Sequence, residues 1–299
     1  MFPDMFQFHV APYIDDFVQW LLLTCGPAFD AFTNLVMGWL ISIEYGLVAI
    51  PWWAWMGLVG AIAWRQTRRW QFALGLSTMI VTIGVLGLWE VTMETLSIVI
   101  VAVLFSLILG IPLGILMAES DRCSTVLTPL LDAMQTMPSF VYLIPALMLF
   151  GLGKVPGVVA TVIYAVPPVV RLTNLGMRQV SESVQEAARA FGADRWQMLK
   201  EVRLPLAMPS VLAGVNQTTM MALSMVVVAS MIGAGGLGEK VLIATNRIAV
   251  GDGFEAGWAI VVMAIVIDRL TQGLARRWQV PSQRSGAAMG QSVVRQGAA

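Results

Sequence analysis

Long apolar runs, separated by short polar stretches, extend through most of the 299-residue chain. A helix needs about 20 mostly apolar residues to cross a bilayer. By that criterion the pattern predicts seven spans, two of them short: 46–64, 71–89, 95–118, 137–151, 155–175, 209–232 and 257–275. The span 137–151 holds Pro138 and Pro145, which could bend it into a gate, although prolines are also common in membrane helices without that role. The pattern therefore predicts an all-α integral membrane protein.

The two ends of the chain have different patterns. Residues 13–44 are aromatic and apolar but carry four acidic residues and are interrupted by Pro27. We expect helices lying along the membrane interface here, not an eighth span. The N-terminus has no positive stretch of the kind that begins a cleavable signal peptide, so we expect it to be retained. The chain thus divides into an interfacial segment (1–45), two accessory transmembrane helices (46–91), a core (92–275) and a small, polar tail predicted to be disordered in the cytoplasm (276–299).

Composition agrees with a membrane protein and leaves little material for bond chemistry. Apolar residues make up 58% of the chain and charged residues 12%, with a mean hydropathy of +0.76. Soluble domains average about 45–50% apolar and about 25% charged residues. The two cysteines, Cys25 and Cys123, fall on opposite sides of the predicted topology, so we expect neither a disulfide nor a metal site. The single histidine, His9, lies in the N-terminal tail, so we expect no catalytic residues and no bound metal.

Arginine and lysine orient the spans, because loops on the cytoplasmic side carry an excess of them. With seven spans, fifteen of the eighteen fall on one side, and only Lys154, Lys240 and Arg247 fall on the other. The N-terminus is therefore expected outside and the C-terminus in the cytoplasm. The eleven tryptophans could form a cage for a quaternary ammonium ligand. They gather near span ends, however, which favours an aromatic belt at the two membrane surfaces.

One polar stretch, residues 186–205, places seven charges in twenty residues on the predicted cytoplasmic side. Ser183 and Glu186 are spaced as a capping box at a helix start, and Gly192 stands where a helix can end in a left-handed residue. Asp194 can cap a second helix, which Pro205 is expected to terminate. We expect a helix, a glycine turn and a second helix before the next span.

The first helix of this hairpin is rich in alanine, at Ala187, Ala188 and Ala190, so another surface can approach its backbone closely. A solvated hairpin with no partner is one alternative. A DNA-reading helix-turn-helix is another, but the seven charges sum to only +1 and the segment is tethered to a membrane. The pattern favours a docking helix for a protein and no binding of nucleic acid.

The same segment resembles the coupling loop of permease subunits of ATP-binding-cassette (ABC) importers. The pattern of E-A-A, three residues, Gly, nine residues, a β-branched residue, one residue and Leu-Pro is met here by Glu186, Ala187, Ala188, Gly192, Val202, Leu204 and Pro205. The strings MQTMPSFVYLIP (134–145), PPVVRLTNLGMRQV (167–180), VNQTTMMALSMVVVASMIGAGGLG (215–238) and DRLTQ (268–272) resemble more narrowly the glycine betaine, proline and choline permeases. The likeness covers roughly residues 49–275.

The resemblance implies a type I ABC importer permease fold whose core, 92–275, carries a cytoplasmic coupling loop at 176–208. It implies a permease homodimer in a bacterial inner membrane, two cytoplasmic ABC ATPase subunits that grip the coupling helices, and an external substrate-binding protein that delivers a compatible solute. ATP and Mg²⁺ are then bound by the ATPase partner and no cofactor by this chain. The permease alternates between inward-open and outward-open states. Which solute is carried, and whether osmotic conditions regulate it, the chain does not reveal.

Polar residues on the span 209–232 are candidates for the pathway, because polar side chains facing lipid are costly. They are Asn216, Gln217, Thr218, Thr219 and Ser224. Hydrogen bonding between helices is an equal alternative for them. GAGGLG (233–238) fits the G-x-G-x-x-G dinucleotide motif, but that motif needs a strand before it. At the predicted outer face, Gly233, Gly235 and Gly236 more plausibly permit a tight backbone path at the outer mouth or gate.

Two other function classes remain as alternatives. An ion-coupled secondary transporter of a small zwitterionic solute needs ionisable residues in mid-span to bind the ion, but Glu90, Glu94 and Asp268 lie near span ends. The absence of a visible internal repeat weakens it further, since many such folds are built from repeats. A membrane enzyme needs clustered catalytic groups on one face, and the sequence shows no such cluster.

Overall fold

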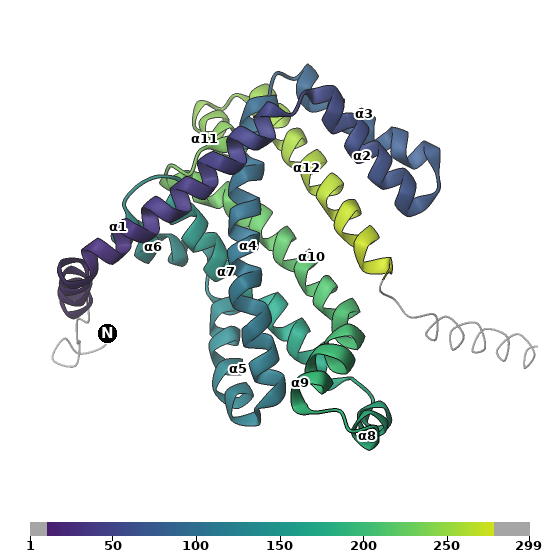
Figure 1. The fold of residues 1–299 in the computed structure, drawn as a ribbon. Coiled ribbons are helices and arrows are strands. Elements are labelled where there is room, and N and C mark those ends of the chain that lie inside the picture. The colour runs from purple at the N-terminus through teal and green to yellow at the C-terminus, as the bar shows by residue number, and fades with distance from the viewer. Residues whose placement is uncertain (1–10, 278–299) are drawn as a thin grey trace, which may run out of the picture.

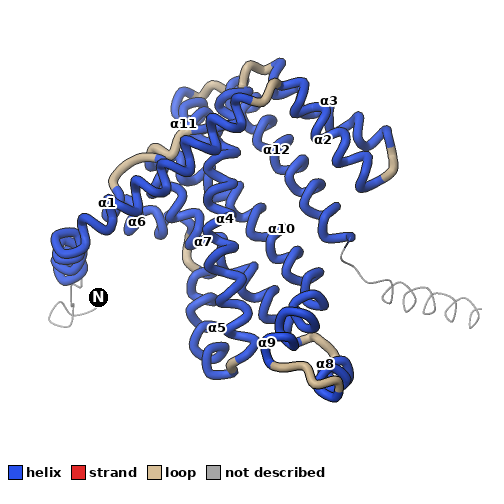
Figure 2. Tube along the Cα trace, in the orientation of Figure 1, coloured by secondary structure: helices blue, strands red, loops and turns tan. Residues whose placement is uncertain are grey.

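The computed structural model of the chain describes residues 11–277, and all its regular elements in that range are helical (Figures 1 and 2). The α-helices are α1 (Ala11–Ala49), α2 (Trp52–Thr67), α3 (Trp70–Val85), α4 (Trp89–Glu119), α5 (Asp121–Thr136), α6 (Leu143–Phe150), α7 (Lys154–Arg178), α8 (Glu182–Ala190), α9 (Arg195–Gln197), α10 (Leu204–Ala229), α11 (Gly236–Arg247) and α12 (Val250–Arg277). Short 3-10 turns cover Ser139–Tyr142 and Ser230–Ile232, and a π-helical turn covers Met198–Arg203.

The core is built from α4, α7 and α10, which pack at close range along small residues. In α4, Gly110 and Gly114 lie one turn apart against α7, and a Cβ added at Gly114 would meet the Val170 carbonyl oxygen at 2.7 Å. On the other side of α7, a Cβ added at Gly214 of α10 would meet the Val169 Cα at 3.0 Å. Apolar lipid supplies little driving force between helices, so close backbone approach through small residues holds such bundles together.

Five helices are long and apolar enough to cross a membrane, or six if the bent pair formed by α5 and the segment Ser139–Phe150 counts as one span. The expected spans 95–118, 155–175, 209–232 and 257–275 are confirmed by α4, α7, α10 and α12. The expected span 137–151 does not form one straight helix, since it holds a 3-10 turn and the short α6, and the chain turns by 109° between α5 and the segment Ser139–Phe150. Pro138, which favours extended backbone in the residue before it, stands at that turn.

The N-terminal part also differs from the expectation. Residues 11–49 form one continuous helix that passes through Pro27 and meets the length and composition of a span. A proline removes only one helical hydrogen bond and can bend a helix without ending it, and Figure 1 shows α1 changing direction near its N-terminal end. At 39 residues, α1 is about 58 Å long, which exceeds a bilayer's hydrocarbon core. The chain then breaks at Pro51, so the expected spans 46–64 and 71–89 are a hairpin of two 16-residue helices.

Several loops gather at the two ends of the bundle (Figure 1). The turns before α4, before α7 and around α11 share one end of the bundle, and α8 and the α4–α5 turn share the other (Figure 1). The arginine-bearing α2–α3 turn lies level with the last turns of α12, since Gln66 donates a hydrogen bond to the Leu270 carbonyl at 3.1 Å. Cys25 and Cys123 are free thiols. The expectations for His9 and for the tail beyond Arg277 lie outside the described residues.

Candidate functional site

The helix α8 projects from the end of the bundle that holds the α4–α5 turn, and it buries none of its residues (Figure 1). It ends as the sequence predicts. Gly192 has φ +85°, its N–H donates to the Arg189 carbonyl at 2.9 Å, and the next N–H, that of Ala193, donates to the Ala188 carbonyl at 3.1 Å. This pair of bonds is the Schellman motif, which requires a left-handed residue. Gly192 therefore fixes the direction in which the chain leaves α8.

The expected capping box at Ser183 and Glu186 was wrong. Ser181 occupies the N-cap of α8, and Ser183 lies inside the first turn with its hydroxyl 2.6 Å from that of Ser181. The capping box of this loop is instead at α9, where Asp194 accepts from the Gln197 N–H at 2.7 Å and Gln197 reaches back to the Asp194 N–H at 3.0 Å. Asp194 thus caps the second helix, as expected.

Pro205 was expected to terminate that second helix, and this expectation was wrong. From Arg195 the helical path continues through the π-helical turn Met198–Arg203 into α10, where Pro205 stands in the first turn. The first turn of a helix tolerates proline, because its N–H has no intrahelical partner there. The wider π turn, in which the Leu204 N–H reaches the Leu199 carbonyl, precedes it. Residues Arg195–Ile232 consequently form one continuous helical segment, which joins the end of the loop to α10.

The exposed surface of the loop carries large apolar side chains among its charged groups. Phe191 is 94% exposed and Trp196 67% exposed, beside Val184 and the exposed Glu186 and Ala187. Exposed apolar groups gathered among charges mark an interaction surface. Sequence reasoning identified Glu186, Ala187, Ala188 and Gly192 but missed the two aromatic residues. Their signal was available, since each is a large apolar residue inside the most charged stretch of the chain.

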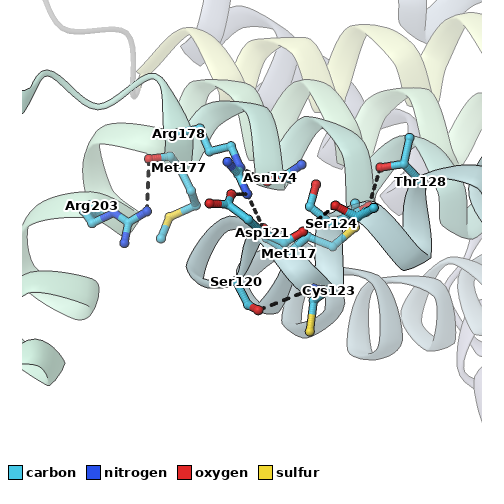
Figure 3. A network of polar contacts seen from close by, with 11 residues as sticks. Met117, Ser120, Asp121, Cys123, Ser124, Thr128, Asn174, Met177, Arg178 and Arg203 are labelled. Carbon is cyan, nitrogen blue, oxygen red and sulfur yellow. Dashed lines mark hydrogen bonds and ion pairs between the residues drawn. The ribbon is translucent and has the colours of Figure 1, made fainter.

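Ion pairs at the base of the loop join neighbouring elements, and Figure 3 shows the one between Arg178 and Asp121. Arg203, on the π turn, pairs with Glu119 at the end of α4. Arg178, at the end of α7, pairs with Asp121 at 2.7 Å and donates to the Met117 carbonyl at 2.8 Å. A recess of about 810 Å³ lies between these groups and α8. Arg203 thus links the π turn to the end of α4, and Arg178 links α7 to α5.

The pathway candidates on α10 separate into two groups. Asn216 donates to Asp268 of α12 at 3.1 Å and accepts from the Thr271 hydroxyl. Thr218 donates to the Ala165 carbonyl of α7 at 2.9 Å. These two side chains join helices. Thr219 bonds its own helix at the Val215 carbonyl and is buried beside an apolar cavity.

Gln217 and Ser224 lie instead on an open face of α10, and each is exposed in the single chain. They are seven residues apart, two helical turns, and Leu206 and Ala213 continue the same face toward the cytoplasmic end. A second exposed stripe lies on α5 and was missed by the sequence analysis; its Asp121 and Asp132 pair with Arg178 and Arg171 of α7. Its exposed polar residues recur at helical spacing: Asp121, Thr125, Thr128, Asp132 and Gln135. The stripe was overlooked because α5 is too polar to be predicted as a span.

The glycines that the sequence singled out lie at the turn that leads from α10 into α11. Gly233, Gly235 and Gly236 have φ of +82°, +81° and +74°, conformations that glycine adopts at no steric cost. A Cβ on Gly235 would meet Glu94 Oε1 at 2.6 Å, and the Leu237 N–H donates to Thr95 Oγ1 at 2.7 Å. The segment thus follows a tight path over the first turns of α4, and it follows a helix rather than a strand.

An ion-pair cluster lies beside this glycine segment. Lys154, at the start of α7, lies 2.9 Å from Glu94 of α4 and 2.9 Å from Glu44 of α1, with all three side chains half-buried. The Gly153 N–H donates to the Ile232 carbonyl at 3.0 Å. Pro138 stands at the α5–α6 bend, and Pro145 occupies the first turn of α6. Both prolines therefore stand where the backbone requires no N–H donor, and neither lies in the glycine segment.

Comparison with known proteins places the chain among permeases. The family model described as "Binding-protein-dependent transport system inner membrane component" matches residues 110–279. The glycine betaine/proline betaine transport system permease protein ProW of Escherichia coli strain K12 is 45% identical over 266 residues, 88% of this chain and 74% of that protein. The glycine betaine/carnitine transport permease protein GbuB of Listeria monocytogenes serotype 1/2a is 44% identical over 278 residues, 92% of this chain and 98% of that protein.

A solved structure shows the same fold. A chain from inward-facing conformations of the MetNI methionine ABC transporter superposes with a TM-score of 0.58 at 20% identity, covering 64% of this chain and 96% of that one. At that identity the likeness speaks for the fold of the core and not for the solute.

Proposed function

Because the chain belongs to the family of binding-protein-dependent transport system inner membrane components, we propose that ATP hydrolysed by a separate subunit drives it to import glycine betaine or a related solute. It is a multi-pass inner membrane protein and a transport permease component. The observation that carries the proposed mechanism is α8, an exposed helix that buries none of its residues, ends at a left-handed glycine and lies beside the exposed Phe191 and Trp196. An exposed helix of this kind is suited to bind a partner protein.

The proposed ATPase partner docks on the loop surface formed by Val184, Ala187, Phe191 and Trp196. Truncated side chains on α8 let the partner approach the backbone, and buried aromatic anchors supply most of the energy in protein interfaces. Closure of two ATPases on bound ATP then moves α8. The movement passes through Arg203 and the continuous α9–α10 rod to the spans. ATP and Mg²⁺ stay with the ATPase, and this chain contributes no group to the hydrolysis.

A second copy of the chain completes the pathway in this proposal. The face of α10 with Gln217 and Ser224 and the polar stripe of α5 are exposed in the single chain, although Asp121 and Asp132 of that stripe pair with Arg178 and Arg171 of α7. Polar side chains at membrane depth face protein or water because exposure to lipid is costly. We assign Gln217 and Ser224 to the pathway wall, and Asn216 to the helix contact with α12. Thr219 is removed from the wall by its burial.

The glycine segment Gly233–Gly236 forms the outer mouth, where an external binding protein delivers the solute. The names of the two similar permeases share glycine betaine, and their second solutes, proline betaine and carnitine, also pair a quaternary nitrogen with a carboxylate. We therefore propose a methylated ammonium solute of that class for this chain. Delivery by the binding protein supplies most of the selectivity.

Uptake by reconstituted protein tests the proposal. Proteoliposomes hold the chain with its ATPase, enclosed ATP and external binding protein, and radiolabelled glycine betaine is added outside. We expect accumulation that stops when ATP, the ATPase or the binding protein is omitted. Proteoliposomes holding the chain alone under a sodium or proton gradient serve as the control. Accumulation in that control would show an ion-coupled transporter and overturn the proposal.

A further inference from the structure

The hairpin of α2 and α3 has an outer surface that no other part of the described chain covers. It packs on α12 and touches α4, while the exposed faces of α5 and α10 lie on other elements (Figure 1). A groove of about 580 Å³ runs along this surface, lined mainly by small and apolar residues: Gly57, Gly60, Ala61, Trp64, Trp70 and Ser77. The hairpin therefore carries an open, mainly apolar groove on its outer surface.

Close packing of the two helices forms the floor of the groove. A Cβ on Gly60 would meet the Ser77 hydroxyl at 2.7 Å, and that hydroxyl donates to the Met56 carbonyl at 3.2 Å. The polar group in the floor is thus satisfied and offers nothing to a polar ligand. From Met56 to Trp64 the groove follows about 12 Å of helix. This length is close to the depth of one leaflet, half of a hydrocarbon core about 30 Å thick.

A positive cluster closes one end of the groove. Arg65, Arg68 and Arg69 lie in or beside the α2–α3 turn, next to the two tryptophans that line the groove, and all three are exposed. None of them takes part in the ion pairs found among residues 11–277. Tryptophan favours the headgroup level of a membrane. The turn lies level with Leu270 near the cytoplasmic end of α12, so the arginines reach the headgroups of the inner leaflet.

The backbone of the turn adds an independent observation. Arg68 has φ +56° and caps α2 in the left-handed conformation. Glycine is the usual residue there, and a bulky side chain in that region is uncommon and strained. Strain kept at a site is a reason to look for a function of the side chain. An arginine at the tip, where glycine would cost less, indicates that its charge is used.

From the groove, the unpaired arginines and the strained Arg68 we propose that the α2–α3 hairpin binds an anionic phospholipid of the inner leaflet. One acyl chain lies in the groove, and the phosphate rests among Arg65, Arg68 and Arg69. Charge complementarity selects this occupant. The C-terminal residues 278–299 contain two arginines and no acidic residue, so the arginine cluster would repel that segment.

Native mass spectrometry of the full chain in detergent tests the assignment. The chain is titrated with phosphatidylglycerol and, separately, with phosphatidylcholine of the same acyl chains. We expect clear preference for phosphatidylglycerol in the wild type. Replacing all three arginines, R65Q/R68Q/R69Q, should weaken phosphatidylglycerol binding on the order of 100-fold, since each arginine near an anionic surface strengthens binding about fivefold. Arg122→Gln, a single exposed arginine at the start of α5, should leave the binding of phosphatidylglycerol unchanged.

Two further variants separate binding from folding. Gly57→Leu fills the groove without a clash, because no atom lies within 4 Å of the added Cβ, and should weaken phosphatidylglycerol binding. Gly75→Leu, equally free of contacts but outside the groove lining, is its matched control. Arg68→Gly relieves the strained turn, so its melting temperature should equal or exceed that of the wild type while phosphatidylglycerol binding weakens about 5-fold.

Equal retention of the two lipids by the wild type, or unchanged binding in the triple arginine variant, would overturn the proposal. Displacement of phosphatidylglycerol by millimolar inorganic phosphate would also overturn it, because the groove would then contribute nothing. These readouts do not depend on transport, so the lipid site stands or falls separately from the proposed import function.

Discussion

Replacing Gly192 with valine is expected to reduce ATP-driven uptake at least tenfold while leaving the chain folded in the membrane. An L-residue in the left-handed conformation costs about 1–2 kcal/mol, and a β-branched one is the worst case. The φ of +85° at this position closes the Schellman turn. No atom lies within 4 Å of the added Cβ, so the substitution causes backbone strain but no clash. We expect the turn to relieve this strain by changing the direction of α8. The ATPase partner can then no longer bind α8 in its normal position.

The chain offers a matched control for that variant. Gly87, in the turn between α3 and α4 at the opposite end of the bundle, has φ +70° and no atom within 4 Å of an added Cβ. Gly87→Val therefore imposes a similar backbone strain away from the coupling loop. Uptake of labelled solute, normalised to the amount of chain in the membrane, is compared in both variants. If Gly192→Val transports as well as Gly87→Val, α8 does not couple ATP to transport.

Replacing Gly114 with leucine is expected to destroy the fold rather than the coupling. A Cβ at Gly114 would lie 2.6 Å from the Thr173 Cβ and 2.7 Å from the Val170 carbonyl oxygen. Backbone cannot move aside as a side chain can, so α4 and α7 must separate. Overpacking of a core commonly costs about 1–3 kcal/mol, and contact with backbone places this site at the upper end or beyond. We expect little monodisperse protein and a strongly lowered melting temperature.

Gly46→Leu in α1 controls for the change of residue type, since no atom lies within 4 Å of its added Cβ. Its yield and melting temperature in detergent should match the wild type. A Gly114→Leu chain that purifies and melts as the Gly46→Leu chain does would show that the α4–α7 contact is looser than 2.7 Å and that the core is not built on these glycines.

The parts of the fold predicted from sequence are those with continuous apolar patterns. The helices α4, α7, α10 and α12 each carry a long apolar run, so their existence followed from composition alone. The helix α5 did not, because its exposed face bears Thr125, Thr128, Asp132 and Gln135, and a half-polar helix inside a membrane protein resembles a loop. Its polar side becomes understandable only once its neighbours, or the lack of them, are known.

Two prolines misled the sequence analysis in the same way. Pro27 and Pro205 were expected to break helices, yet α1 continues through Pro27 and α10 begins around Pro205. Whether proline ends a helix depends on whether the freed carbonyl finds another partner or the helix widens, which is decided in three dimensions. At Gly192 the local chemistry was sufficient, since the Schellman turn involves only neighbouring backbone. The partners of Asn216 and Thr218 were not accessible from sequence, because they lie on α12 and α7.

The claim that α8 is a cytoplasmic handle gripped by an ATPase is tested most directly by labelling residue 190. In a chain carrying Cys25→Ser and Cys123→Ser, Ala190→Cys is exposed to a membrane-impermeant maleimide in intact cells and in everted vesicles. Lys240→Cys, on the exposed surface of α11, serves as the outward-facing reference. The account predicts labelling of residue 190 only in everted vesicles, and protection from labelling when the ATPase subunit is bound. Labelling of residue 190 in intact cells, where residue 240 is also labelled, would contradict it.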